Sequence, residues 1–165
     1  MIIQVLALLA LVLALWTVFR FAMGLRWAKV SREDARAAEQ ARGRRVVAEI
    51  PVSDDEIVFF VEDDAGFYWG GRQARKRDIR GARLLLNGAV MASFACEGER
   101  LPDSAPPEEY EGGERWEIAL YLRGGRDERV ACGRLREGVS RELAGRVFEA
   151  IRRATWSSNL SASGG

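Results

Sequence analysis

The first 19 residues of the chain contain no charged side chain, and basic residues begin at Arg20. A helix rises about 1.5 Å per residue, so a helix over residues 1–23 is long enough to cross the roughly 30 Å hydrocarbon core of a bilayer. The sequence therefore predicts a transmembrane anchor over residues 1–23. The side chains expected to hold this anchor in the membrane are Ile2, Leu6, Leu9, Leu13, Trp16, Phe19, Arg20 and Trp27.

The basic residues follow the apolar run instead of preceding it. Because Lys and Arg remain on the cytoplasmic side, this order predicts a single-pass protein whose C-terminal part lies in the cytoplasm. A cleaved secretory signal would have its basic residues first, so it fits less well. Residues 24–43 are rich in Ala, Arg and Glu, and we expect a helical juxtamembrane stalk there. Ala7, Ala10 and Ala14 share one helix face, through which the anchor could self-associate into a homo-oligomer.

Beyond Gly43 the chain changes to short apolar runs separated by turn residues, a pattern typical of a β domain. Asn87 and Gly88 tolerate the positive φ angles of a two-residue hairpin, and large apolar side chains occupy every second position from Trp116 to Leu122. The seven expected strands cover residues 45–50, 56–62, 66–71, 82–87, 89–95, 116–123 and 128–133.

Two further segments complete the expected domain. Residues 97–113 are acidic and hold three of the four prolines, which predicts a mobile loop. Residues 140–156 place Leu143, Val147 and Ile151 on one stripe, so they are expected to form an amphipathic helix capped by Ser140. The composition of residues 157–165 predicts a disordered tail.

Seven short antiparallel strands followed by one amphipathic helix make up the element order of pleckstrin-homology-like (PH-like) domains. Over residues 44–156 the chain resembles small bacterial or prophage-associated proteins that join an N-terminal transmembrane helix to such a domain. The segments that carry the resemblance are DIRGARLLLNG, WEIALYL and SRELAGRVFEAI. It implies an α+β, mainly antiparallel β fold, a barrel or sandwich closed by the C-terminal helix, and an interaction module without a catalytic centre. The Lys-x-Arg motif that binds phosphoinositides in eukaryotic members is absent from the first hairpin, so that activity does not carry over.

The chain has no histidine, which removes the commonest general base and metal ligand. The acidic groups at 54–56 and 62–64 lack the spacing of a calcium loop, and no glycine-rich run has the residues of a phosphate loop. We therefore expect no enzymatic activity, no metal and no cofactor. The alternative is a thiol-dependent enzyme with Cys96 or Cys132 as nucleophile, although both lie in strand-like runs that favour buried free thiols.

Six basic side chains lie within residues 72–83, directly after three aromatic residues. This combination suits an acidic protein or an anionic lipid, while the alternative is a solvated loop beside half-buried aromatic rings. Nucleic acid is not expected, because the chain beyond Arg45 carries a net negative charge. The candidate binding surface consists of Phe67, Tyr68, Trp69, Arg72, Arg75, Lys76, Arg77 and Arg80.

The anchor, the strand order and the lack of catalytic groups favour a membrane-anchored, non-enzymatic adaptor. The sequence predicts that it displays its domain for protein binding on the cytoplasmic face of the bacterial inner membrane. Two alternatives remain: a prophage-encoded superinfection-exclusion factor that acts at the inner membrane, and an anionic-lipid-binding module.

Overall fold

The computed structural model describes residues 13–17, 19–20, 32–52, 56–103, 113–133 and 137–162. The chain divides into two compact units, Met1–Arg42 and Gly43–Gly165. In the first unit, residues 13–17, 19–20 and 32–41 are helical. Near its end, Arg42 Nη1 lies 2.6 Å from Glu39 Oε1.

The membrane anchor is contradicted. Within the described residues, no helix is both long enough and apolar enough to cross a membrane. This finding contradicts the predicted single-pass transmembrane topology and the predicted location in the bacterial inner membrane. Residues 13–17 and 19–20 of the predicted span are helical, and the other residues of 1–23 lie outside the described residues. Of the predicted anchor residues, Leu13, Trp16, Phe19 and Arg20 belong to these stretches, whereas Ile2, Leu6, Leu9 and Trp27 lie outside the described residues.

The second unit begins with a four-stranded antiparallel sheet in the order β1-β2-β3-β4. Asp63 shapes the turn between β2 and β3, because its Oδ1 accepts hydrogen bonds from the N–H groups of Ala65 and Gly66, each at 2.9 Å. The strands of this first sheet are β1 (Arg45–Pro51), β2 (Ile57–Glu62), β3 (Gly66–Trp69) and β4 (Arg72–Arg75).

A short 3-10 helix, η1 (Lys76–Asp78), leads into a second antiparallel sheet in the order β6-β5-β7-β8. The hairpin between β5 and β6 turns at Asn87 and Gly88, whose φ angles are 49° and 81°, as their residue types predict. The strands of this second sheet are β5 (Ile79–Leu86), β6 (Ala89–Ala95), β7 (Trp116–Leu122) and β8 (Asp127–Ala131).

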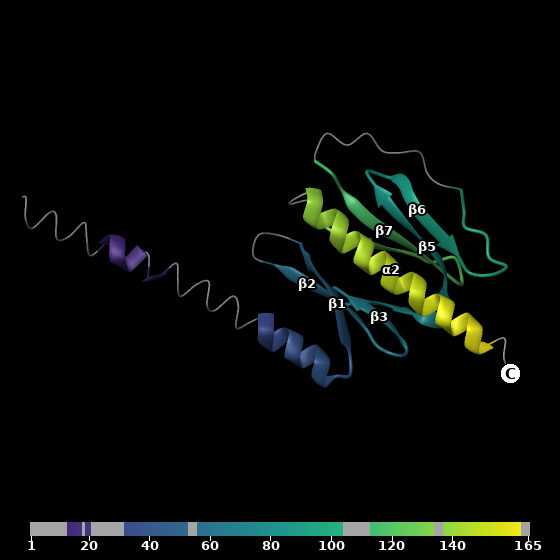
Figure 1. Cartoon of the computed structure of the whole chain (residues 1–165), viewed down its shortest axis with the longest axis horizontal. Coiled ribbons are helices and arrows are strands. Elements are labelled where there is room, and N and C mark those ends of the chain that lie inside the picture. Colours follow the sequence, from purple (N-terminus) through teal and green to yellow (C-terminus); the bar gives the residue numbers. More distant parts are fainter. Residues whose placement is uncertain are drawn as a thin grey trace, which may run out of the picture. The chain divides into compact units, whose positions relative to one another are not determined.

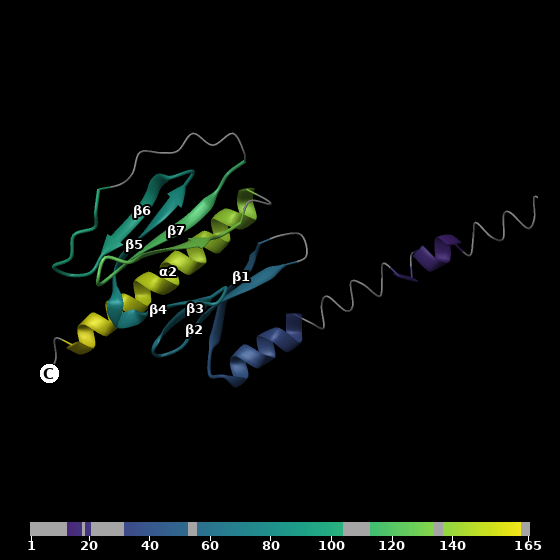
Figure 2. The same cartoon turned by 180° about the vertical axis from the view of Figure 1, so that it is seen from behind.

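The helix α2 (Glu137–Ala162) packs against β1 of the first sheet and against β5 and β7 of the second (Figures 1 and 2). On its apolar stripe Val147 and Ile151 are buried and Leu143 is half-buried. The ring of Phe148 meets that of Phe94 edge to face with centroids 5.5 Å apart. The largest fully buried side chains of the core come from both sheets and the helix: Phe60, Phe67, Ile118, Leu120, Ile151, Val130, Val147 and Cys132.

The predicted fold class is also contradicted. The described residues form eight strands in two separate four-stranded sheets and no closed barrel, so the seven-stranded PH-like barrel is wrong, although the structure is mainly β with a C-terminal helix. The missed strand, β4, has the sequence RQAR, in which only Ala74 is buried. A strand with exposed charges at both ends has no apolar alternation for sequence analysis to detect.

The boundaries of α2 and of the acidic loop also differ from expectation. The helix begins at Glu137, so Ser140 is a buried residue of its first turn, and it continues through Ala162 into the segment expected to be a tail. At the start of the acidic loop, Arg80 Nη2 and Arg83 Nη2 donate to the carbonyl oxygens of Arg100 and Pro102 at 2.8 and 2.6 Å. Residues 104–112 of that loop lie outside the described residues.

Two glycines give opposite expectations for stability. A Cβ at Gly81 would lie 2.9 Å from Leu101 Cδ2, 3.0 Å from Ala95 Cα and closer still to the Phe94 carbonyl oxygen, whereas one at Gly145 in α2 would meet no atom within 4 Å. We expect Gly81→Ala to lower the free energy of unfolding by about 1–3 kcal/mol through crowding. Gly145→Ala should raise it by about 0.5–1 kcal/mol because alanine favours the helix. Urea denaturation of both variants measures these changes, and a neutral Gly81→Ala would contradict the close β5–β6 approach.

Candidate functional site

The aromatic part of the predicted binding surface lies largely in the core. Phe67 is fully buried and Trp69 is 7% exposed. Both contact Phe60 of β2, with ring centroids 5.5 Å apart for Phe67 and 5.6 Å apart for Trp69. These two rings therefore stabilise the domain and are closed to a ligand.

Tyr68 is half-buried and belongs to a local polar cluster. The guanidinium of Arg44 covers its ring at 3.9 Å and places Nε 3.8 Å from Asp63 Oδ2. A hydrogen bond to the Asp63 carboxylate raises the pKa of the Tyr68 hydroxyl. Burial alone would raise the pKa of Asp63, but hydrogen bonds from the Gly66 N–H, the Tyr68 hydroxyl and the Ala65 N–H hold it below its usual value. The cluster fixes the β2–β3 turn.

Lys76 is also committed to a partner inside the domain. Its Nζ lies 2.9 Å from Glu62 Oε1 and 5.5 Å from the centroid of the Phe67 ring, and Arg45 pairs with the other carboxylate oxygen of Glu62. Burial raises the pKa of Glu62, but the hydrogen bonds and charges of Arg45 and Lys76 outweigh it and hold that pKa below its usual value. This arrangement neutralises Lys76 and connects η1 to β2.

Three of the predicted arginines each have an acidic neighbour. Arg72 Nη1 lies 3.2 Å from Glu128 Oε2 and so connects β4 to β8. Arg80 Nε lies 2.8 Å from Glu99 Oε2. Arg77, which is more exposed, has Nε 3.9 Å from Asp78 Oδ1. These guanidinium groups have carboxylates to offset their charge.

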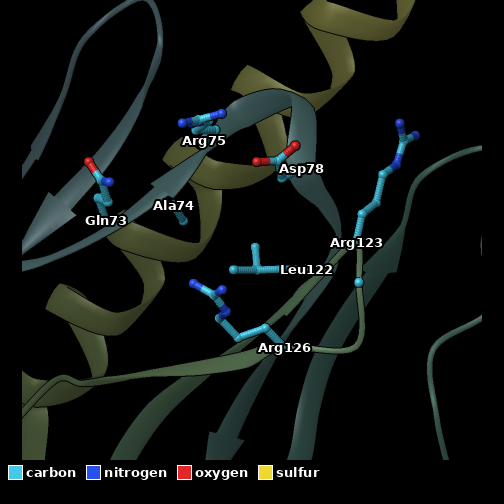
Figure 3. Close-up of a pocket in the computed structure, with 8 residues that line it drawn as sticks. Gln73, Ala74, Arg75, Asp78, Leu122, Arg123 and Arg126 are labelled. Carbon is cyan, nitrogen blue, oxygen red and sulfur yellow. The ribbon is translucent and has the colours of Figure 1, made fainter.

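Arg75 differs from the other predicted basic residues. It is exposed at the end of β4 and makes no ion pair within the described residues. It lines a pocket of about 350 Å³ between β4 and η1 on one side and the β7–β8 turn on the other (Figure 3). The residues around this pocket are Gln73, Ala74, Arg75, Asp78, Leu122, Arg123, Gly124 and Arg126.

Two other arginines of this pocket come from the β7–β8 turn. Arg123 donates its backbone N–H to the Asp78 carbonyl oxygen at 2.7 Å, and its Nε lies 3.5 Å from Glu99 Oε1, so its side chain points away from the pocket centre (Figure 3). Arg126 lies across Leu122 from Arg75, and like Arg75 it has no ion-pair partner in the part of the chain that the structure describes. We call Arg75 and Arg126, with the space between them, the arginine pocket.

The chemistry of the arginine pocket is that of an anion site. Two guanidinium groups without an ion-pair partner among the described residues flank an aliphatic floor of Ala74 and Leu122. The Gln73 amide and the Asp78 carboxylate, which pairs with Arg77, also line the pocket. Arginine donates paired hydrogen bonds to a carboxylate or phosphate, which gives charge-assisted contacts with defined geometry. Sequence analysis selected Arg75 but missed Arg126, whose signal is the RGGR turn that sets two arginines around Gly124 and Gly125.

Acidic and cysteine side chains are the groups that metal or thiol chemistry would use. No group of three or more acidic or cysteine side chains able to hold a metal ion occurs among the described residues. Burial, with a smaller contribution from Glu117, raises the pKa of the Cys132 thiol to about 12, so it stays protonated at neutral pH. The Cys96 Sγ lies 3.3 Å from the Ile79 carbonyl oxygen and is half-buried.

Comparison with protein-family models, with curated proteins and with solved structures gives no match to this chain. The argument for function therefore rests on the geometry of the site. The resemblance to PH-like proteins and the prophage origin stay predictions.

The Glu62 cluster makes stability depend on pH. The pKa of Glu62 in the folded chain lies below the ordinary value of 4.5, so the stability from its ionised form is fully present above about pH 4.5 and is lost as pH falls through the folded-state pKa. Glu62→Gln removes this contribution, so we expect the variant to be less stable at neutral pH and the difference from wild type to shrink in acid. Urea unfolding from pH about 7 to about 3 measures the difference. A constant difference over this range would contradict the assignment.

The burial of Cys132 predicts its reactivity. We expect a maleimide to leave Cys132 unlabelled in the native full chain and to label it after denaturation, because the native thiol is buried and protonated. Peptide mass spectrometry of labelled protein separates Cys132 from Cys96. Rapid native labelling of Cys132 would contradict the structure and would favour the thiol-enzyme alternative.

Proposed function

We propose that the unit Gly43–Gly165 is a non-enzymatic protein-interaction module that binds an acidic segment of a partner protein in the arginine pocket. The observation that carries this proposal is the pair of guanidinium groups, Arg75 and Arg126, that lack acidic partners among the described residues while the neighbouring arginines have them. A carboxylate between them would supply the missing anion, and hydrogen bonds to charged groups contribute about 1.5–3 kcal/mol each.

The shape and the charge of the site favour a protein segment over other anions. A pocket lined by two strands and a turn admits a single side chain or a bend of a peptide, whereas a flat bilayer surface meets only its rim. Nucleic acid requires a row of cations to neutralise successive phosphates. Here Glu128 pairs with Arg72 and Asp78 pairs with Arg77, so the basic residues near the pocket do not form an uninterrupted row and the site suits one or two carboxylates.

The proposal predicts that the full chain binds a fluorescein-labelled peptide rich in Glu and Asp, but not its Gln and Asn counterpart. Arg75→Gln combined with Arg126→Gln should weaken binding by at least about tenfold, or about 1.4 kcal/mol, because both charge-assisted contacts are removed. Fluorescence anisotropy titration measures the affinity. The matched control is Arg141→Gln with Arg152→Gln, which removes the same charge from exposed positions on α2.

Three results would overturn the proposal. The first is failure of the wild-type chain to bind the acidic peptide at about 1 mM, the weakest affinity of interest. The second is an equal loss of affinity in the pocket and control variants, which would indicate only a net-charge effect. The third is binding of phosphatidylserine vesicles, but not of the peptide, through Arg75 and Arg126, which would assign the pocket to a lipid headgroup.

A further inference from the structure

Two open sheets leave four edge strands, β1, β4, β6 and β8, among the described residues. An edge strand presents unpaired backbone N–H and C=O groups, so it can pair with another strand. Proteins suppress such pairing with charges, prolines, short strands or a covering element. The four edges of this domain differ in how far they are protected.

Three of the edges carry these protections. In β1, Arg45, Glu49 and Pro51 combine charge with proline, and α2 packs against the strand. The strand β4 has only four residues, two of which are arginine. The strand β8 begins with three consecutive charged residues, Asp127 to Arg129.

The fourth edge is β6, whose seven residues have the sequence AVMASFA. It contains no charge and no proline, and Val90 and Met91 are 40% and 55% exposed. A register shift between Leu84 and Leu85 of β5 leaves Met91 without a direct partner, which marks a bulge near the hairpin end. The rest of the strand, 92–95, pairs with β5 in regular register.

The register shows which backbone groups of β6 face the open edge. The Cys96 N–H donates to the Arg80 carbonyl oxygen at 2.8 Å, and Ala82 and Leu84 are opposite Phe94 and Ala92. Since bonded pairs alternate along an antiparallel ladder, the even-numbered residues bond to β5. Ser93 and Ala95 therefore direct their N–H and C=O groups outward. Their side chains are exposed on the face opposite Phe94, which contacts Phe148 of α2.

We propose that β6 pairs antiparallel with β6 of a second copy of this chain, which joins the two second sheets into one continuous sheet. In such a two-fold arrangement the residue on the axis faces its own counterpart, so a charge there would meet the same charge. The uncharged β6 avoids this repulsion in every register, whereas β1, β4 and β8 all carry charged side chains. Ser93 lies on the two-fold axis with its outward N–H and C=O bonded to Ser93 of the other copy, and Ala95 faces Met91.

A second copy fits this edge better than an acidic or basic partner segment. The strand offers no charged side chain to such a segment, and Arg80, beside it on β5, already pairs with Glu99. Met91 and Val90 would instead be covered by the equally apolar strand of the second copy. The pairing uses β6 and leaves the arginine pocket on β4 and the β7–β8 turn open, so the two proposals can fail separately.

The first test is the mass of the full chain in solution, measured by sedimentation equilibrium over a range of concentrations. We expect a dimer, and Ser93→Lys should raise its dissociation constant by at least about tenfold, since two lysines would meet at the axis. The matched control is Ala131→Lys, which adds the same charge to an exposed residue of the β8 edge. Circular dichroism confirms that both variants remain folded.

The second test is cross-linking in a Cys96→Ser background, in which Cys132 is buried. Ser93→Cys should form a disulfide-linked dimer on mild oxidation, because directly paired residues of antiparallel strands have Cα atoms about 4.5–5.5 Å apart. Ala131→Cys should not. A monomer at about 100 μM, well above a micromolar dissociation constant, would overturn the proposal. So would a dimer that is unchanged by Ser93→Lys and gives no Ser93→Cys cross-link.

Discussion

The apolar face of α2 is the constraint on which the rest of the domain depends. The two sheets share no strand pairing within the described residues, so the ladder of hydrogen bonds does not join them. Val147, Phe148 and Ile151 are buried on a helix that packs against strands of both sheets, and each large side chain so buried stabilises the fold by about 1.5–3 kcal/mol. The helix therefore fixes the position of one sheet relative to the other. The connection through η1 and the ion pair between Arg72 of β4 and Glu128 of β8 add to this constraint.

This packing also creates the arginine pocket. Arg75 ends the first sheet and Arg126 lies in a turn of the second, so the distance between the two guanidinium groups is set by how the sheets meet. The backbone bond from the Arg123 N–H to the Asp78 carbonyl oxygen holds the turn against η1. A ligand that bridges the two arginines would therefore bind an interface between sheets, and its binding would stabilise the arrangement that α2 imposes.

Local signals in the sequence predicted the elements better than their assembly. The Asn87–Gly88 hairpin and the alternation in β7 are determined within a few residues, and the structure has both. The division into two sheets depends on non-local packing, and β4 has too little apolar pattern to be detected. At the site, the sequence predicted a binding surface from the aromatic residues that precede the basic run. Phe67 and Trp69 are buried instead, because every second residue of β3 faces the core. Arg126 was missed because it approaches Arg75 only through the fold.

The two proposed recognition surfaces rely on different physical properties, and their charge distributions differ. Around the arginine pocket, ion pairs such as Arg72–Glu128 and Arg80–Glu99 offset basic charge. The long-range attraction of the domain for polyanions is therefore weak. A ligand would have to fit between two specific guanidinium groups. The strand β6 carries no charged side chain. There the backbone hydrogen bonds would hold a paired strand, and charged side chains would only repel strands of like charge. If both proposals hold, an acidic segment would bind at the pocket and not at the edge, whereas a second apolar strand would pair at the edge and would find no complementary charge at the pocket.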